Sequence, residues 1–232
     1  MTTVIVMPGT GSDADFVARV FGPAARTAGI EPTCLEPTAD LVADYLSRID
    51  AHVARGERVV VGGVSIGAAV ALRWALDERN AAHCDGVLAA LPPWSGAPAA
   101  SIAAASARLT ADALDRDGLT ATVDAMVATS PGWLGAELAR SWRSLYGRGL
   151  VDQLRAASTF TAPTLADIAG LRVPLGVAVA PDDPLHPASV GRDWARAAPR
   201  AAVVETPLSV FGPDERVLGD ACWSAWRSAC AR

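Results

Sequence analysis

Lysine is absent from this chain, and all 20 basic residues are arginines. This excludes covalent catalysis through a lysine Schiff base and a phosphate-binding loop of the Walker type, since both need that side chain. The chain also holds only three histidines and four cysteines, and the cysteines follow neither metal-ligand nor C-x-x-C spacing. We therefore expect buried free thiols, no metal site and no cofactor.

An excess of positive charge and long apolar runs are lacking as well. The formal net charge of −5 argues against a nucleic-acid partner, which requires basic clusters for phosphate contacts. No apolar stretch reaches the roughly 20 residues of a membrane helix, and no targeting signal follows Met1. We expect a cytoplasmic protein that acts on a small molecule away from membranes. Self-association is left open.

What is present is typical of a globular protein with one large core. Hydrophobic residues make up 51% of the 232 residues and charged residues 19%. Short apolar runs alternate with helical patterns, and this alternation predicts an α/β fold with a mostly parallel sheet of about six strands and helices on both faces. The predicted strands are 4–7, 33–36, 58–62, 86–91, 173–180 and 201–205.

The alternation stops between residues 92 and 165, where no β-branched run occurs and four helical patterns follow one another. We predict a core of residues 1–91 and 166–232 with a helical insertion at 92–165. The alternative is that this stretch forms part of the main helical layer.

The most informative motif is Gly63-Val64-Ser65-Ile66-Gly67. It follows a predicted strand and precedes a predicted helix, which is the context of a nucleophile elbow. Such a strained turn needs small residues on both sides and presents the serine hydroxyl above the edge of the sheet. Ser65 is therefore the candidate nucleophile. The alternative is a serine that only caps the following helix.

The elbow, the order of the strands and the position of the insertion resemble the α/β-hydrolase superfamily over the whole chain. The resemblance implies a helical cap at 92–165 and an oxyanion hole made by two backbone amides, those of Ile66 and Thr10. Thr10 lies in the loop Pro8–Ser12, which in the family normally follows the third strand. The family's first two strands are then absent here.

The resemblance also implies an acid after the strand at 173–180, where Asp183 precedes a proline and Asp182 is the fallback. It places the histidine in the loop after the last strand, but residues 207–215 contain none. His186 is the candidate base, or else a turn residue at the rim of the pocket. His52 and His83 are expected at the opposite end of the sheet.

Two carboxylates, Asp214 and Glu215, occupy the loop where the histidine is expected. Either would need burial to act as a base, because an unperturbed carboxyl group has a pKa near 4. The simpler interpretation places them at the start of the last helix, where acidic residues favour the helix dipole.

These observations favour a serine hydrolase, an esterase or thioesterase-like enzyme for a small, largely apolar acyl substrate. Its catalytic residues would be Ser65, Asp183 and His186, and its substrate-binding residues are predicted to be Gly9, Trp94, Met126, Trp133 and Trp142. The main alternative is a non-hydrolytic protein of the same fold that binds a ligand or partner, because the histidine is missing from its usual loop.

A third interpretation is a dinucleotide-binding domain, since residues 9–14 fit the pattern G-x-G-x-x-A between a strand and a helix. Against it, Asp13 and Asp15 would face the pyrophosphate in the first turn of that helix, where like charges repel. It also leaves the elbow unexplained.

Overall fold

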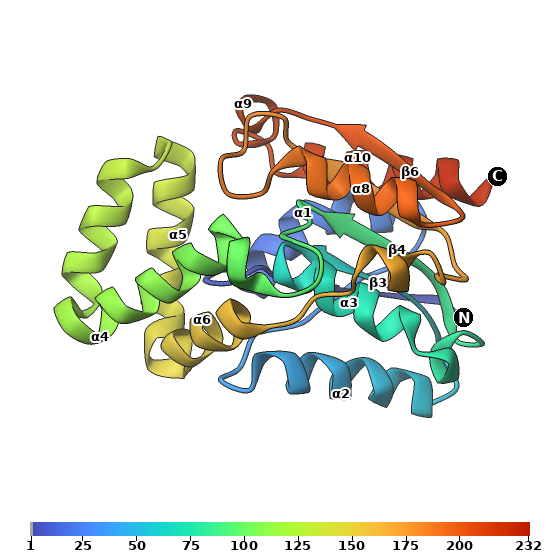
Figure 1. Cartoon of the computed structure of the whole chain (residues 1–232), viewed down its shortest axis with the longest axis horizontal. Coiled ribbons are helices and arrows are strands. Elements are labelled where there is room, and N and C mark those ends of the chain that lie inside the picture. The colour runs from blue at the N-terminus through green and yellow to red at the C-terminus, as the bar shows by residue number, and fades with distance from the viewer. Residues whose placement is uncertain (1) are drawn as a thin grey trace.

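The protein is described by a computed structural model that covers residues 2–232, and its centre is a six-stranded sheet (Figure 1). The strand order is β2-β1-β3-β4-β5-β6, and every neighbouring pair is parallel. The strands are β1 (Thr2–Met7), β2 (Thr33–Cys34), β3 (Arg58–Val64), β4 (Cys84–Ala90), β5 (Leu175–Val179) and β6 (Ala201–Glu205). The predicted fold class, with about six mostly parallel strands, is confirmed.

Helices cover both faces of the sheet because successive strand residues point to opposite sides. In β1, Ile5 and Met7 pack with one layer of helices, whereas Val4 and Val6 pack with the other. The first layer is α2 (Leu41–Ala54), α3 (Ile66–Leu76) and α8 (Ala188–Ala197), and the second is α1 (Ala14–Thr27) and α10 (Arg216–Cys230). This double burial explains why the strand sequences are continuous apolar runs.

The helices between β4 and β5 form a separate group, which we call the cap helices: α4 (Ile102–Thr129), α5 (Gly132–Leu145) and α6 (Leu150–Thr159). They share an apolar cluster of their own that includes Leu114, Trp142 and Leu154. Figure 1 shows α4 and α5 beyond one end of the sheet. The division of the chain at residues 92 and 165 stays a prediction.

Two chain segments connect the cap helices to the sheet and lie side by side. The Gly96 amide donates to the Pro163 carbonyl at 3.2 Å, and the Trp94 indole Nε1–H donates to the Phe160 carbonyl, also at 3.2 Å. Within the cap, Gly118 has φ 77° and interrupts α4. The kink there divides α4 into two helical stretches.

The remaining elements are short. They are the helices α7 (Leu165–Ile168) and α9 (Leu208–Phe211) and the 3-10 turns η1 (Glu78–Asn80), η2 (Pro98–Ala100) and η3 (Tyr146–Arg148). Of the four free cysteines, Cys84 and Cys222 are buried and Cys34 is partly buried. Cys230 is exposed, so the prediction of a buried thiol is wrong at that position.

Candidate active site

Ser65 lies at the sharp turn between β3 and α3, with φ 54° and ψ −120°. A positive φ is strained for any residue other than glycine, and such strain is typical of functional turns. The turn also needs glycine on both sides, because the end of β1 passes close to it. A Cβ atom at Gly63 or at Gly67 would each lie 2.3 Å from the carbonyl oxygen of Met7.

The His186 ring lies between Ser65 and Asp183. Its Nε2 is 2.9 Å from the Ser65 Oγ, and its Nδ1 is 2.8 Å from the Asp183 Oδ2. Because a carboxylate can only accept, Nδ1 carries the proton and Nε2 is free to accept the hydroxyl proton of Ser65. The three side chains therefore form one hydrogen-bonded chain with the donor order that a serine nucleophile needs.

The acid and the base come from the same turn after β5. Asp183 Oδ1 accepts the backbone amides of Leu185 at 2.7 Å and His186 at 3.1 Å, so the carboxylate folds the turn that carries the histidine. Burial alone would raise the pKa of Asp183. The hydrogen bonds from the His186 ring and from the two amides outweigh that burial and lower the pKa of Asp183 below its ordinary value.

The fallback acid has a different position. Asp182 Oδ1 accepts the backbone amide of Leu208 at 2.7 Å, which links the turn after β5 to α9.

The segment after β6, where a histidine was expected, places Leu208 and Phe211 at the cavity beside Ser65. Glu215 pairs with Arg19, and Asp214 accepts the backbone amide of Arg216.

The other two histidines lie at the far end of the sheet, as expected. The His83 carbonyl accepts the amide of Val59 at the start of β3, whereas Ser65 follows the end of that strand. His52 Nδ1 lies 2.8 Å from a carboxylate oxygen of Glu57. His186 is thus the histidine that the fold brings to Ser65.

Two backbone amides were predicted to face the serine. Ile66 is the first residue of α3, so its amide has no carbonyl partner within the helix, and its side chain is fully buried. Thr10 lines the cavity in the loop Pro8–Ser12. Gly9 of that loop is so near that an added Cβ would lie 3.2 Å from the Ser65 Cβ. The oxyanion role of Thr10 and Ile66 stays a prediction.

A cavity of about 250 Å³ opens at Ser65, Asp183 and His186 and extends between the sheet and the cap helices. Of the predicted substrate-binding residues, Gly9, Trp94, Trp133 and Trp142 line it. Met126 does not, because it packs against the apolar cluster of the cap helices. Helical spacing alone could not tell which face of α4 looks toward the cavity.

The sequence interpretation missed several lining residues, namely Phe16, Leu91, Leu208 and Phe211. Two of them, Leu208 and Phe211, follow the last strand, where only a histidine was sought. Leu91, with φ 49°, directly follows β4, next to the elbow. A search for apolar residues after the carboxyl end of every strand would have found these three.

Comparison with known families decides the assignment. The model described as "Alpha/beta hydrolase family" matches residues 4–214. The chain belongs to the alpha/beta hydrolase family. A search of curated protein sequences found no significant match.

Solved structures of similar fold agree with membership in the alpha/beta hydrolase family. MenH from S. aureus superposes with a TM-score of 0.75 at 14% identity, covering 98% of this chain and 94% of that one. An enol-lactonase from Burkholderia xenovorans gives 0.71 at 18% identity, with coverage of 100% and 92%. A thermophilic esterase from Thermogutta terrifontis gives 0.68 at 18%, with coverage of 95% and 88%. At these identities the likeness shows the fold.

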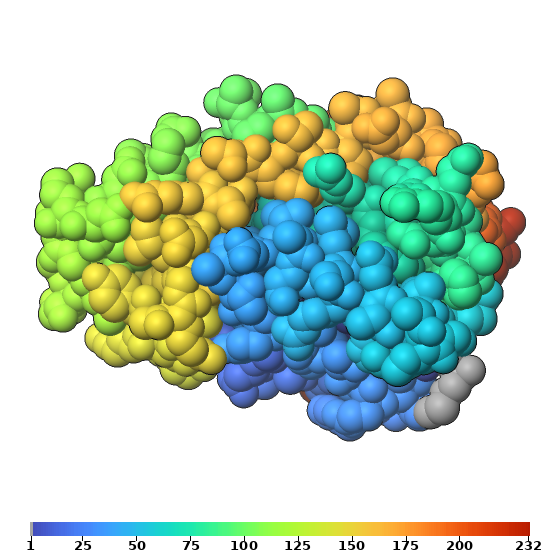
Figure 2. Space-filling model, turned by 90° about the horizontal axis from the view of Figure 1, so that it is seen from below, coloured from blue at the N-terminus to red at the C-terminus, as the bar shows by residue number. Residues whose placement is uncertain are grey.

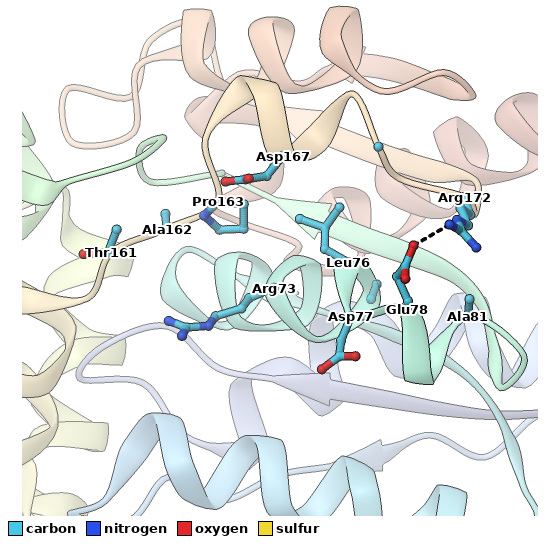
Figure 3. Close-up of a pocket in the computed structure, with 12 residues that line it drawn as sticks. Arg73, Leu76, Asp77, Glu78, Ala81, Thr161, Ala162, Pro163, Asp167 and Arg172 are labelled. Atoms are coloured by element: carbon cyan, nitrogen blue, oxygen red, sulfur yellow. Dashed lines mark hydrogen bonds and ion pairs between the residues drawn. The ribbon is translucent and has the colours of Figure 1, made fainter.

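This alpha/beta hydrolase chain has a second, larger hollow of about 590 Å³, beside the carboxyl end of α3 (Figure 3). Several of its charged side chains have partners: Arg172 pairs with Glu78 at 2.5 Å, and Asp167 accepts the Thr164 hydroxyl at 2.7 Å. Ser65 and His186 do not line it. The candidate catalytic residues therefore lie in the smaller cavity, at Ser65.

Two further features bear on the alternatives. The first turn of α1, where a pyrophosphate would bind in a dinucleotide-binding domain, already holds two carboxylates: Asp13 accepts the Phe16 amide and Glu36 accepts the Ala14 amide.

Within residues 2–232, no helix is long and apolar enough to cross a membrane.

Proposed function

We propose that this protein is a serine hydrolase that cleaves ester or thioester bonds of small, largely apolar acyl substrates. The observation that carries the proposal is the hydrogen-bonded chain from Ser65 Oγ through the His186 ring to Asp183, at 2.9 and 2.8 Å. It also weighs against the main alternative, since a non-hydrolytic protein was suggested by the lack of a histidine in the loop after the last strand.

In the first step, His186 Nε2 takes the hydroxyl proton of Ser65 while Oγ bonds to the acyl carbon. The carbonyl electrons move to its oxygen, and the amides of Thr10 and Ile66 would donate to that oxyanion. Asp183 keeps the imidazole in the required tautomer and stabilises the imidazolium, with no proton transfer to the carboxylate.

The tetrahedral intermediate then collapses, and the bond from the acyl carbon to the leaving oxygen or sulfur breaks. The imidazolium gives its proton to the leaving group, which departs as an alcohol or thiol. Water then hydrolyses the acyl-serine in a second step. His186 takes a proton from water, and the resulting hydroxide attacks the acyl carbon. The bond from the acyl carbon to Ser65 Oγ breaks, Ser65 regains its proton from His186, and the carboxylic acid leaves.

The walls of the cavity support the proposed substrate class. Aromatic and aliphatic side chains dominate them, among them Trp94, Trp133, Trp142 and Leu138. The charged neighbours at this end are paired, as for Glu137 with Arg19 at 2.7 Å. An apolar acyl chain gains from burial there, whereas a charged one would lose its hydration without an unpaired opposite charge to replace it.

Turnover of nitrophenyl esters with acyl chains of different length tests the proposal. We expect measurable hydrolysis by the wild type and a loss on the order of a million-fold in kcat for Ser65→Ala and for His186→Ala, as found when the base is removed from triad enzymes. His83→Ala is the matched control, because that ring lies at the opposite end of the sheet. No turnover with any acyl chain would favour the non-hydrolytic alternative.

A further inference from the structure

Cap helix α5 contacts the loop Pro8–Ser12 directly. The hydroxyl of Ser141, a fully buried residue, donates to the carbonyl of Gly11 at 2.6 Å across 130 positions of sequence. Within the loop, the Ser12 amide donates to the Gly9 carbonyl at 3.1 Å, and Gly11 has φ 75°. Residues 9–12 thus form a tight turn whose third residue, Gly11, has the positive φ that favours glycine, and α5 binds the carbonyl of Gly11.

The same helix holds the residue that follows the loop. Asp13 caps α1 by accepting the Phe16 amide at 3.1 Å, and it forms two hydrogen bonds of 2.8 Å with the Arg140 guanidinium of α5. Only 6% of the Asp13 side chain is exposed. A buried carboxylate that lost this arginine would keep only the Phe16 amide and the nearby Arg19, which is unfavourable, so the pair fixes α5 against the start of α1.

A second carboxylate, Glu36, also accepts an amide at the start of α1 and pairs with an arginine of the cap. Glu36 accepts the Ala14 amide at 3.0 Å and pairs with Arg148, at the end of η3, at 2.8 Å. The Gln153 amide of α6 also reaches the Pro37 carbonyl at 3.4 Å. Figure 2 shows this part of the cap (yellow) packed against the chain that leads into α2 (blue). Both acceptors at the start of α1 are therefore paired with cap arginines.

The indole of Trp142 completes the contact. An added Cβ at Gly11 would lie 2.5 Å from the Trp142 Nε1, so α5 packs on the backbone of the loop without space for a side chain. Trp142 also lines the cavity at Ser65. One helix turn, residues 140–142, thus contacts the loop through a hydrogen bond and a ring, and contacts the next residue, Asp13, through an ion pair.

We propose that α5 is the positioning element of the oxyanion hole, with Ser141 and Arg140 holding the loop Pro8–Ser12 so that the Thr10 amide faces the substrate. The inference rests on the proposed serine hydrolase function and adds a requirement to it. The oxyanion donor is in place only while the cap helices are seated on the start of α1. Ser141 and Arg140 act through the loop and do not touch the reacting atoms.

The test compares Ser141→Ala and Arg140→Gln with Arg143→Gln, a control on the same helix whose guanidinium donates only to the Ala139 carbonyl. Loss of one oxyanion donor costs about 100-fold or more in kcat, so a loosened loop should lower kcat by about tenfold to 100-fold. KM should change little, since the cavity walls remain. Amide hydrogen exchange should accelerate at residues 9–14 in the two test variants and not in the control.

Normal exchange at residues 9–14 in both test variants would overturn the proposal, as would faster exchange with unchanged kcat. A fall in kcat with exchange accelerated throughout the cap helices would also contradict it, because that pattern indicates general loosening. A wild type without hydrolytic activity would reject the proposed function instead. The exchange measurement would still decide whether α5 holds the loop.

Discussion

Asp183 and His186 lie three positions apart on one turn, and the carboxylate binds both the ring and the backbone of the histidine. Oδ2 accepts from the ring Nδ1 at 2.8 Å, and Oδ1 accepts from the His186 amide at 3.1 Å. Acid and base are therefore positioned as one unit by a single loop. The loop after β6 is left to supply apolar cavity walls, Leu208 and Phe211.

Asp183→Asn should lower kcat for ester hydrolysis by about 10,000-fold, the effect of the corresponding change in a well-studied triad, because an amide no longer fixes the required imidazole tautomer. Steady-state kinetics with a nitrophenyl ester gives the value. Asp182→Asn is the matched control, since that carboxylate binds the Leu208 amide and not the ring. A larger loss in the control than in Asp183→Asn would mean that the acid has been misassigned.

The elbow and the parallel sheet could be predicted because their signals are local. Gly63 and Gly67 flank Ser65 within five residues, and the apolar strands are continuous in sequence. The contact of the His186 ring with Ser65 could not be predicted. It depends on the conformation of the turn after β5, which Asp183 stabilises by accepting two backbone amides. Contacts between distant segments, such as Ser141 with Gly11, leave no local pattern.

The cap shows the same limit. Its helices could be recognised from their period, but two apolar residues at helical spacing were given the same role and differ in the structure. Trp133 lines the cavity, whereas Met126 is partly buried and packs against the apolar cluster of the cap helices. The rotation of each helix about its axis is set by packing against other elements, which a single sequence does not state.

Gly67→Ala should destabilise the protein by about 3 kcal/mol or prevent folding, because its Cβ would lie 2.3 Å from the Met7 carbonyl oxygen and the backbone has to move. Urea unfolding measures the change. Gly132→Ala, also at the start of a helix, has no atom within 4 Å of the new Cβ and should be neutral or slightly stabilising. Equal stability of the two variants would contradict the packing described at the elbow.

Asp13→Asn should change how stability depends on pH. Burial would raise the pKa of Asp13, but Arg140, the Phe16 amide and Arg19 together lower it. The unfolded chain therefore binds more protons than the folded one between the two pKa values, so wild-type stability falls as the pH drops below the ordinary aspartate range, near 4. The variant should be less stable at neutral pH and lose less on acidification.

Urea unfolding at several pH values between about 7 and 3 measures this difference. Asp15→Asn provides the control, because its side chain is 62% exposed and its ion pairs contribute little. An acid-induced loss of stability in Asp13→Asn equal to that of the wild type would show that the Asp13–Arg140 pair is not formed in solution.

Leu208→Ala should extend the range of accepted acyl chains. Leu208 lines the cavity at Ser65 and is only partly buried, so its truncation opens space without emptying the core. Since one methylene in an apolar pocket is worth about tenfold or more in kcat/KM, the preference between longer and shorter nitrophenyl esters should shift by at least that factor. Met126→Ala, outside the cavity, should leave the preference unchanged.

Reaction with a fluorophosphonate, followed by mass spectrometry of the intact and digested protein, tests the central claim most directly. The account predicts one covalent adduct, mapped to Ser65, that forms in the folded wild type and is absent from Ser65→Ala and from unfolded protein. His186→Ala should label far more slowly, because the hydroxyl has lost its base. Labelling at the same rate with and without the His186 ring, or no adduct at Ser65 at all, would contradict the account.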